Sequence, residues 1–199
     1  EWFNKYSELF ENLEVEDEGQ GRLKKHHVGI INYLEEDGLA VTVMNRKLQG
    51  LKNFEEIEEV ELPKNFKGSL RPYQKAGYDW LHFLKNFKFG GCLADDMGLG
   101  KTVTTLAFLQ KMKEDKPESP SILVMPTSLI YNWQKEASKF TPKMKILIHF
   151  GQNRHKDAGA FKFYDLIICS YGVLRLDIDF LKNHRFNYAI LDESQAIKN

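Results

Sequence analysis

The chain has 199 residues, of which 42% are hydrophobic and 28% charged, which suits a globular protein with one full α/β domain and a small extra element. No run of eighteen apolar residues occurs, which excludes a helical membrane span, and the acidic residues 1–18 lack the pattern of a signal peptide. The six histidines and two cysteines show no metal-ligand spacing.

Formal charges cancel over the whole chain, but they are unevenly distributed. Residues 1–66 hold 8 Lys and Arg against 15 Asp and Glu, a balance of −7. Residues 67–199 hold 20 against 13, a balance of +7. The mildly basic second part is able to bind phosphates, although an ordinary solvated surface explains the same charge balance equally well.

The first part of the chain, residues 1–65, is predicted to be a small, mainly helical accessory region. Apolar residues at helical spacing favour helices over residues 2–13 and 23–34. The acidic, glycine-containing stretch 14–21 is typical of a loop, and residues 41–44 fit either a short strand or the start of another helix. No motif assigns a role to this region.

From residue 66 onwards, short apolar runs alternate with amphipathic stretches. Each run is too short for a helix and apolar on both faces, as in central strands of a parallel sheet. The expected strands are 89–94, 122–125, 146–150, 166–169 and 188–191, and the expected helices are 73–87, 101–113, 129–140 and 172–182, with a loop and a short helix over 151–161. This alternation predicts a three-layer α/β domain with a mostly parallel sheet over residues 66–199, in which Cys92 and Cys169 are reduced core cysteines.

The segment Asp95–Thr102 has the pattern of a phosphate-binding loop between a predicted strand and a predicted helix. Gly98 and Gly100 let backbone N–H groups turn toward phosphate oxygens, and the helix that begins at Lys101 adds its positive end. Lys101 can reach the β- and γ-phosphates of a nucleotide, and the Thr102 hydroxyl can bind Mg²⁺. Asp95 stands where the usual pattern has its first glycine. The residues expected to contact the nucleotide here are Asp96, Met97, Gly98, Leu99, Gly100, Lys101, Thr102 and Val103.

The last apolar run ends in two carboxylates, Asp192 and Glu193. A phosphate-binding-loop enzyme needs an acid at the end of a neighbouring strand to hold the water shell of Mg²⁺, and Asp192 is placed for that role. Glu193 is the candidate for orienting and deprotonating the attacking water. A solvated acidic turn would explain the pair alone, but not its place after a phosphate-binding loop and several alternating strands. The sequence therefore predicts that the glycine turn and the carboxylate pair face one cavity.

Four strings, in this order and spacing, resemble the motifs of the Snf2 family of superfamily 2 helicase-like ATPases, in its bacterial form. They are Leu70–Gln74, Leu93–Thr102, Met125–Leu129 with Asn132 and Trp133, and Asp192–Asn199. The resemblance covers residues 66–199 and implies the first RecA-like lobe, a three-layer αβα sandwich, of a DNA-dependent ATP hydrolase that translocates on DNA and remodels its partners. It also implies ATP and Mg²⁺ as cofactors, double-stranded DNA as a partner, a second RecA-like lobe, and a cytoplasmic place near the nucleoid, or a nuclear one in a eukaryote.

Carried over position by position, the resemblance implies that Gln74 reads the adenine edge, because a side-chain amide donates and accepts at once. Trp133 would pack beneath the DNA-contacting residues. Ser194, where alanine is more usual, and Gln195, where some members have histidine, would relay the nucleotide state to the DNA side. Hydroxyl and backbone N–H contacts to the phosphates of one DNA strand are expected from Pro126, Thr127, Ser128, Asn132, Ser170 and Tyr171.

Residues 1–199 contain no candidate for the second lobe, whose arginines neutralise charge on the γ-phosphate in such motors. Because an arginine of this kind contributes a factor of ~10³–10⁵, we expect weak nucleotide binding and negligible turnover from this chain alone. A nucleotide-gated interaction module is an alternative, which the intact Lys101 and Glu193 oppose. A strand-separating helicase of the same superfamily is another, which the string around Gly98 disfavours. A small-molecule kinase would not explain the four strings together.

Overall fold

The computed structural model divides the chain into two compact units, Glu1–Phe54 and Glu55–Asn199. The second unit thus begins about ten residues before the boundary expected from composition, and its packing below explains why. The described residues are 14–16, 20–22, 57–96, 98–115, 119–152, 154 and 158–197. Within them, no helix is both long and apolar enough to cross a membrane.

The first unit contains an antiparallel strand pair, β1 (Glu14–Glu16) and β2 (Gln20–Arg22), with Val15 in register with Gly21. The prediction of a loop over 14–21 is therefore wrong for these strands. Residues 14–16 and 20–22 pair as antiparallel strands, so the stretch is not a loop throughout. The expected helices 2–13 and 23–34, and the segment 41–44, lie outside the described residues.

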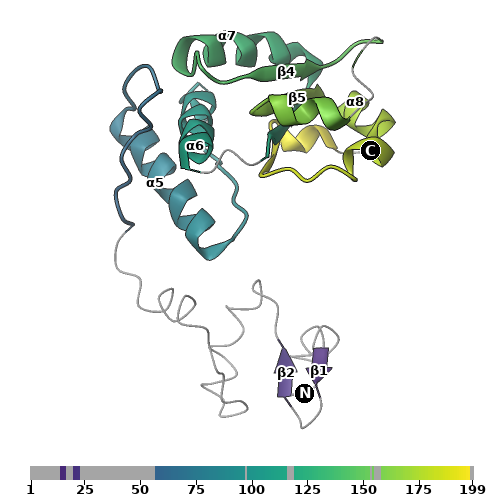
Figure 1. Ribbon diagram of the computed structural model, residues 1–199. Coiled ribbons are helices and arrows are strands. Elements are labelled where there is room, and N and C mark those ends of the chain that lie inside the picture. The colour runs from purple at the N-terminus through teal and green to yellow at the C-terminus, as the bar shows by residue number, and fades with distance from the viewer. Residues whose placement is uncertain are drawn as a thin grey trace. The chain divides into compact units, whose positions relative to one another are not determined.

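The sheet of the second unit has four parallel strands in the order β4-β5-β3-β6 (Figure 1). Leu123, in the middle of β3, is in register with Ile168 of β5 on one side and with Ile190 of β6 on the other. Four of the five expected strands are thereby confirmed. Their bounds are β3 (Ser121–Met125), β4 (Ile146–His149), β5 (Leu166–Ser170) and β6 (Ala189–Leu191).

Successive side chains of a strand point to opposite faces of the sheet, so an apolar strand presents apolar side chains on both faces. Helices cover both of these faces. Leu123 and Ile168 pack in one cluster with α5, α6 and α7, whereas Ile122 and Ile167 pack in a second cluster with η3, α8 and α9. The predicted three-layer α/β domain is confirmed. The helices are α5 (Pro72–Phe87), α6 (Lys101–Asp115), η2 (Thr127–Leu129), α7 (Ile130–Phe140), η3 (Ala158–Phe163), α8 (Tyr171–Leu176), α9 (Ile178–Leu181) and η4 (Ser194–Ile197).

Residues 89–94, expected to be the strand before the phosphate-binding loop, do not belong to the sheet, so this prediction is wrong. The segment instead runs against α5. A Cβ atom on Gly91 would lie 2.2 Å from Leu84 Cδ1 and 2.8 Å from Trp80 Cη2, so any side chain at this position would have to displace Leu84 or Trp80. Two adjacent glycines also offer a strand no side chains to pack. Cys92 is consequently exposed, and the prediction of a core cysteine is correct for Cys169 alone.

Thiol labelling should distinguish the two cysteines. We expect a reagent such as DTNB to react with Cys92 in the native protein and with Cys169 only after unfolding. Cys169 is fully buried, and burial, aided by the charge of Asp177, raises the pKa of its thiol to about 12. The measurement is the number of thiols titrated before and after denaturant, and Cys92→Ser should leave the native protein unreactive. Rapid native reaction of both thiols would contradict the assignment.

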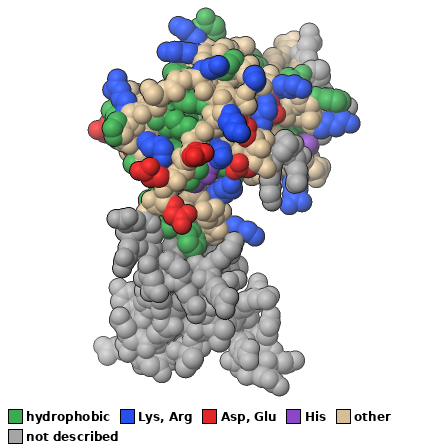
Figure 2. All heavy atoms as spheres, turned by 60° about the vertical axis from the view of Figure 1, so that its left-hand side comes forward, with side chains coloured by type: hydrophobic (Ala, Val, Ile, Leu, Met, Phe, Trp, Pro, Cys, Tyr) green, Lys and Arg blue, Asp and Glu red, His purple; other side chains and the backbone are tan. Residues whose placement is uncertain are grey.

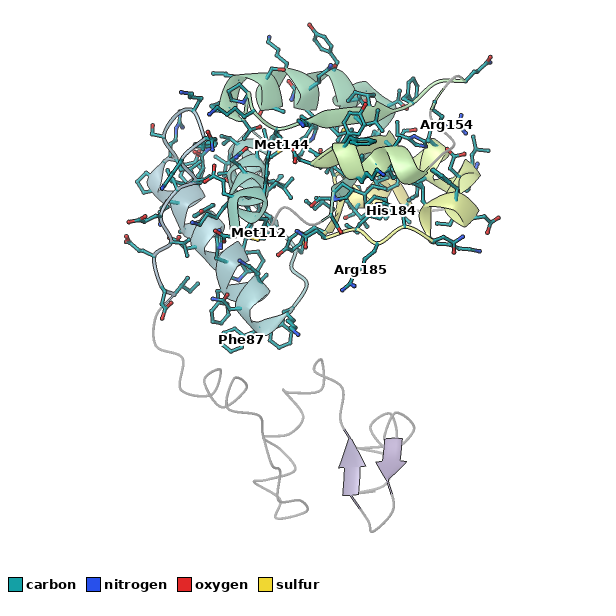
Figure 3. The ribbon with its side chains drawn as sticks, viewed as in Figure 1. Phe87, Met112, Met144, Arg154, His184 and Arg185 are labelled. Atoms are coloured by element: carbon teal, nitrogen blue, oxygen red, sulfur yellow. The ribbon has the colours of Figure 1, made fainter. Side chains whose placement is uncertain are left out.

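The expected helix 172–182 is two short helices, α8 and α9, which meet at Asp177. The Asp177 carboxylate accepts hydrogen bonds from Arg154 Nη2 at 2.7 Å and from His149 Nε2 at 2.9 Å. Arg154 itself comes from the segment that follows β4 (Figure 3). The bonds from Arg154 hold the pKa of Asp177 at about 2, against the opposing effect of partial burial. Asp177 therefore ties the loop after β4 to the α8–α9 junction.

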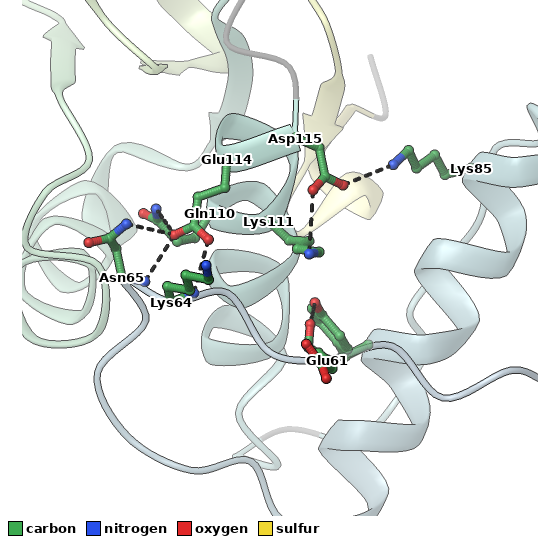
Figure 4. Close-up of polar contacts among 9 residues, drawn as sticks. Glu61, Lys64, Asn65, Lys85, Gln110, Lys111, Glu114 and Asp115 are labelled. Atoms are coloured by element: carbon green, nitrogen blue, oxygen red, sulfur yellow. Dashed lines mark hydrogen bonds and ion pairs between the residues drawn. The ribbon is translucent and has the colours of Figure 1, made fainter.

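The segment before α5 packs against the helices of the second unit, which explains why this unit begins earlier than the predicted boundary. Val60 and Leu62 contact the first cluster, and Val60 N donates to Asp79 Oδ1 of α5 at 2.9 Å. Further along, the Glu114 carboxylate at the end of α6 accepts four hydrogen bonds of 2.9 Å, from the backbone N–H groups of Lys64 and Asn65 and from the side chains of Asn65 and Gln110 (Figure 4). One carboxylate therefore fixes the turn that leads into α5.

Replacing Glu114 by glutamine is expected to lower the free energy of unfolding by about 1–3 kcal/mol, because charge-assisted hydrogen bonds are lost. Partial burial raises the pKa of Glu114, but its hydrogen bonds outweigh that effect and lower the pKa to about 2 from an ordinary 4.5. This contribution is therefore complete above pH 4.5 and disappears as the pH falls toward 2. Urea unfolding across that range measures it, with the exposed Glu58→Gln as control. Equal loss in both variants would contradict the prediction.

Candidate nucleotide-binding site

A glycine turn precedes α6, as the phosphate-binding pattern requires. Gly98 and Gly100 have φ angles of +84° and +80°, in the left-handed region that favours glycine. A Cβ atom on Gly98 would meet nothing within 4 Å, so the turn is open on that side. Lys101 is the first residue of α6, and the free N–H groups at a helix N-terminus suit a phosphate. Met97 lies outside the described residues, and Asp95 and Asp96 are exposed.

Gln74, the expected adenine reader, lies against this turn. Its Oε1 accepts from Arg71 N at 3.0 Å, and its Nε2 donates to Leu99 O at 2.9 Å. A Cβ atom on Gly100 would lie 2.5 Å from Gln74 Nε2, so the contact depends on glycine. Because an amide carries two N–H groups and two acceptor lone pairs, one donor and one acceptor of Gln74 stay available. An adenine edge needs one of each.

The Lys101 ammonium is folded back over the turn. Its Nζ donates to Asp95 O at 2.6 Å and lies 3.5 Å from Asp96 O. Both partners are neutral backbone carbonyls, so no carboxylate has to be displaced before this charge pairs with a phosphate. The side chain is therefore held close to the place where the predicted role requires it.

The acidic pair directly follows β6. Asp192 N donates to Val124 O at 2.8 Å, which extends the β3–β6 pairing beyond the strand. Glu193 has φ +50°, in the left-handed region that a residue with a side chain adopts at a cost, and such positions concentrate at functional sites. The Glu193 carboxylate accepts a hydrogen bond from Gln195 Nε2, and η4 begins at Ser194. The backbone here is bent sharply right after the sheet.

Two aromatic side chains from other elements hold Asp192. Trp133 Nε1 donates to Asp192 Oδ2 at 2.7 Å, and Tyr171 OH donates to Asp192 O at 2.8 Å. Partial burial, together with the charges of Asp192 and Glu193, raises the pKa of the Tyr171 hydroxyl above its ordinary value. Sequence analysis missed these contacts, because Trp133 and Asp192 are 59 residues apart and no local spacing joins them.

The residues expected to meet DNA follow β3 and β5. Thr127 and Ser128 are exposed in η2, and Asn132 Nδ2, on α7, donates to Glu136 Oε1 at 3.2 Å. Ser170 is 4% exposed, and its hydroxyl accepts from Val173 N at 3.2 Å as the N-cap of α8. On the face drawn in Figure 2, Lys and Arg side chains are spread among Asp and Glu rather than gathered in one patch.

The two halves of the candidate site are held by different helices. Gln74 of α5 supports the glycine turn, whereas Trp133 of α7 and Tyr171 of α8 support Asp192. Within the described ranges, no hydrogen bond or ion pair joins Lys101 to Asp192 or Glu193. That both halves face one cavity stays a prediction. A pocket of about 250 Å³ lies elsewhere, at the amino ends of β3 and β5, where Lys113, Lys145 and Lys162 line it.

The oxygen donors of the site suit Mg²⁺, which binds proteins through one or two oxygens together with phosphates and water. Thr102 supplies a hydroxyl, and each carboxylate oxygen of Asp192 accepts one hydrogen bond and keeps further lone pairs. The described residues include no cluster of three His, Cys, Asp or Glu side chains able to hold a metal ion. A magnesium ion at this site would thus depend on a nucleotide for its other ligands.

A three-layer α/β fold with a glycine turn at the start of a helix and an acidic pair after a parallel strand defines the class of P-loop nucleotide-binding domains. The chain belongs to the family of the SNF2-related domain, which matches residues 73–199. Its fold is accordingly the RecA-like fold of the Snf2 ATPase core. The family resemblance and the fold class drawn from the sequence are both confirmed.

Similar proteins support this assignment over much of the chain. YwqA of Bacillus subtilis (strain 168), which is named as a candidate ATP-dependent helicase/translocase, is 40% identical over 77% of this chain. Helicase SWR1 of Candida albicans is 36% identical over 94% of this chain. The SWI2/SNF2 ATPase core of Sulfolobus solfataricus in complex with dsDNA is 41% identical and superposes with a TM-score of 0.65, covering 71% of this chain and 29% of that one.

The chain spans only 17% of YwqA and 11% of the Candida SWR1 helicase. Several relatives are named as ATP-dependent helicases, so the use of ATP is a property of the family. The chain thus belongs to a Snf2-type family of helicase-like ATPases.

Proposed function

We propose that this chain is the ATP-binding lobe of a DNA-dependent ATPase that translocates along double-stranded DNA. The observation that carries the proposal is the likeness to the DNA-bound SWI2/SNF2 core, with 41% identity and a TM-score of 0.65. The relative named as a helicase/translocase, 40% identical to this chain, supports movement along DNA.

The nucleotide would lie against the turn at 98–102. Gln74 would bind the adenine edge with its available donor and acceptor, and Lys101 would exchange the carbonyls of the turn for β- and γ-phosphate oxygens. Backbone N–H groups and the positive end of α6 would stabilise the phosphate charge. Magnesium, held through Thr102 and Asp192, would neutralise charge that develops on the phosphates. Glu193 would orient the attacking water and take its proton.

Duplex DNA would lie along the exposed side chains of η2 and the start of α7, with Ser170 and Tyr171 behind them. Hydroxyl groups and backbone N–H groups bind phosphates without reading bases, which suits a protein that moves along any sequence. A second RecA-like lobe would close on the nucleotide and supply arginines to the γ-phosphate. Because such arginines contribute a factor of ~10³–10⁵, this chain alone would turn over ATP very slowly.

The test is ATP hydrolysis by the complete protein in which this chain occurs, measured with and without duplex DNA. We expect duplex DNA to stimulate hydrolysis and a triplex-displacement assay to detect movement, while a forked duplex stays unseparated. Hydrolysis indifferent to DNA would favour a nucleotide-gated interaction module instead. Separation of the forked duplex would favour a strand-separating helicase.

A further inference from the structure

Asp192 is held from three directions. Its Oδ2 accepts from Trp133 Nε1 at 2.7 Å, its Oδ1 accepts from Glu193 N at 3.1 Å, and its backbone O accepts from Tyr171 OH at 2.8 Å. Its own N–H bonds to Val124 O at 2.8 Å. Both the backbone and the carboxylate of this residue are therefore fixed in direction.

The donor on the carboxylate comes from a deeply buried side chain. Trp133 is 4% exposed, and its indole N–H has no other role than to donate. A buried donor without a partner is costly, so the bond to Asp192 also satisfies a requirement of the core. Its acceptor is charged, which makes the bond shorter and stronger than one between neutral groups. Rotation of the carboxylate would break it.

The two aromatic donors come from the two segments proposed to meet DNA. Trp133 lies on α7, one residue after Asn132 and shortly after η2, and Tyr171 directly follows Ser170 at the end of β5. A shift of either segment would thus pull on the same aspartate. Two hydrogen bonds, from Trp133 and Tyr171, therefore connect the segments proposed to contact DNA with the aspartate proposed to bind magnesium.

We propose that Trp133 and Tyr171 are positioning residues that aim Asp192 at the magnesium nucleotide and link it to the DNA-contacting segments. The proposal rests on the proposed function, since it assigns the orientation of the metal-binding carboxylate in that same site. Both residues would act through Asp192 and not through contact with the nucleotide. Partners that orient a metal-binding group are worth about 10–100-fold in metal affinity when they are removed.

The experiment compares Trp133→Phe and Tyr171→Phe with the unaltered complete protein. Phenylalanine removes each donor and keeps an aromatic ring in the core. Calorimetry would give the Kd of a non-hydrolysable ATP analogue in excess Mg²⁺ and again in EDTA. We expect about 10–100-fold weaker binding in Mg²⁺ for Trp133→Phe, a smaller loss for Tyr171→Phe, and unchanged binding in EDTA. Tyr164→Phe, which removes a hydroxyl group in the pocket at the amino ends of β3 and β5, is the matched control and should bind like the unaltered protein.

A second measurement addresses the link to DNA. Duplex DNA and the magnesium nucleotide must change each other's affinity by the same factor. We expect DNA to strengthen binding of the magnesium nucleotide in the unaltered protein. The same strengthening should be much smaller in Trp133→Phe. Unchanged affinity in Mg²⁺ for both variants would overturn the proposal. Equal weakening in Mg²⁺ and EDTA would also overturn it, because that is the result of a merely structural role. Failure of the unaltered protein to bind the analogue would instead remove the proposed function itself.

Discussion

Alanine in place of Lys101 is expected to abolish nucleotide binding in the presence of Mg²⁺ and to lower DNA-stimulated ATP hydrolysis by at least ~10²-fold. The ammonium is the one cation that the structure places on the glycine turn itself, where it bonds the carbonyls of Asp95 and Asp96 in the described part of the loop. Without it, the phosphates lose a charge-assisted bond that neither the backbone nor the helix dipole replaces.

The measurement is analogue binding together with steady-state hydrolysis by the complete protein. Lys111→Ala is the matched control, because Lys111 lies on the same helix and pairs with Asp115 on its surface. Far-ultraviolet circular dichroism should be the same for both variants, since the Lys101 side chain supports only the open turn. Retention of hydrolysis in Lys101→Ala, with loss in the control, would contradict the assignment of the turn.

Exchange of Glu193 for glutamine is expected to leave nucleotide binding intact and to lower the rate of hydrolysis by about 10²–10⁴-fold. The amide is nearly isosteric with the carboxylate and still accepts the hydrogen bond from Gln195, but it cannot take a proton from water. The loss should therefore fall on kcat, with KM for ATP little changed.

Single-turnover hydrolysis and analogue binding separate the two effects. Glu59→Gln, at an exposed position of the segment before α5, makes the same chemical change away from the site and should behave like the unaltered protein. A variant that loses binding as strongly as it loses hydrolysis would show that Glu193 supports the site rather than the chemistry.

The sequence predicted the sheet well because four of its strands are apolar on both faces, which few other structures require. It failed at residues 89–94, where an apolar composition concealed a glycine, Gly91, that packs against Trp80 and Leu84. Composition indicates which residues are buried, but tertiary packing decides whether a sheet or a helix buries them. The same limit explains the single helix expected over 172–182, which Asp177 divides through contacts with Arg154 and His149.

The glycine turn and the acidic pair were predictable because each is a local pattern with a local physical purpose. Gly98 and Gly100 do adopt the left-handed backbone that the pattern requires, and Glu193 shares it without being a glycine. The contacts of Asp192 were not predictable, since they join residues distant in the chain. No periodicity or spacing indicates which buried tryptophan donates to which carboxylate.

The place of Trp133 also gives the protein an optical reporter of its own. Its indole is buried and donates a hydrogen bond to the Asp192 carboxylate beside the proposed ion. The fluorescence of Trp133 therefore responds to any change in the electric field at that carboxylate. Trp80, on α5, lies against Gly91 in the segment that leads to the glycine turn. Ligand titrations can thus be followed by intrinsic fluorescence, without attaching a dye to either half of the lobe.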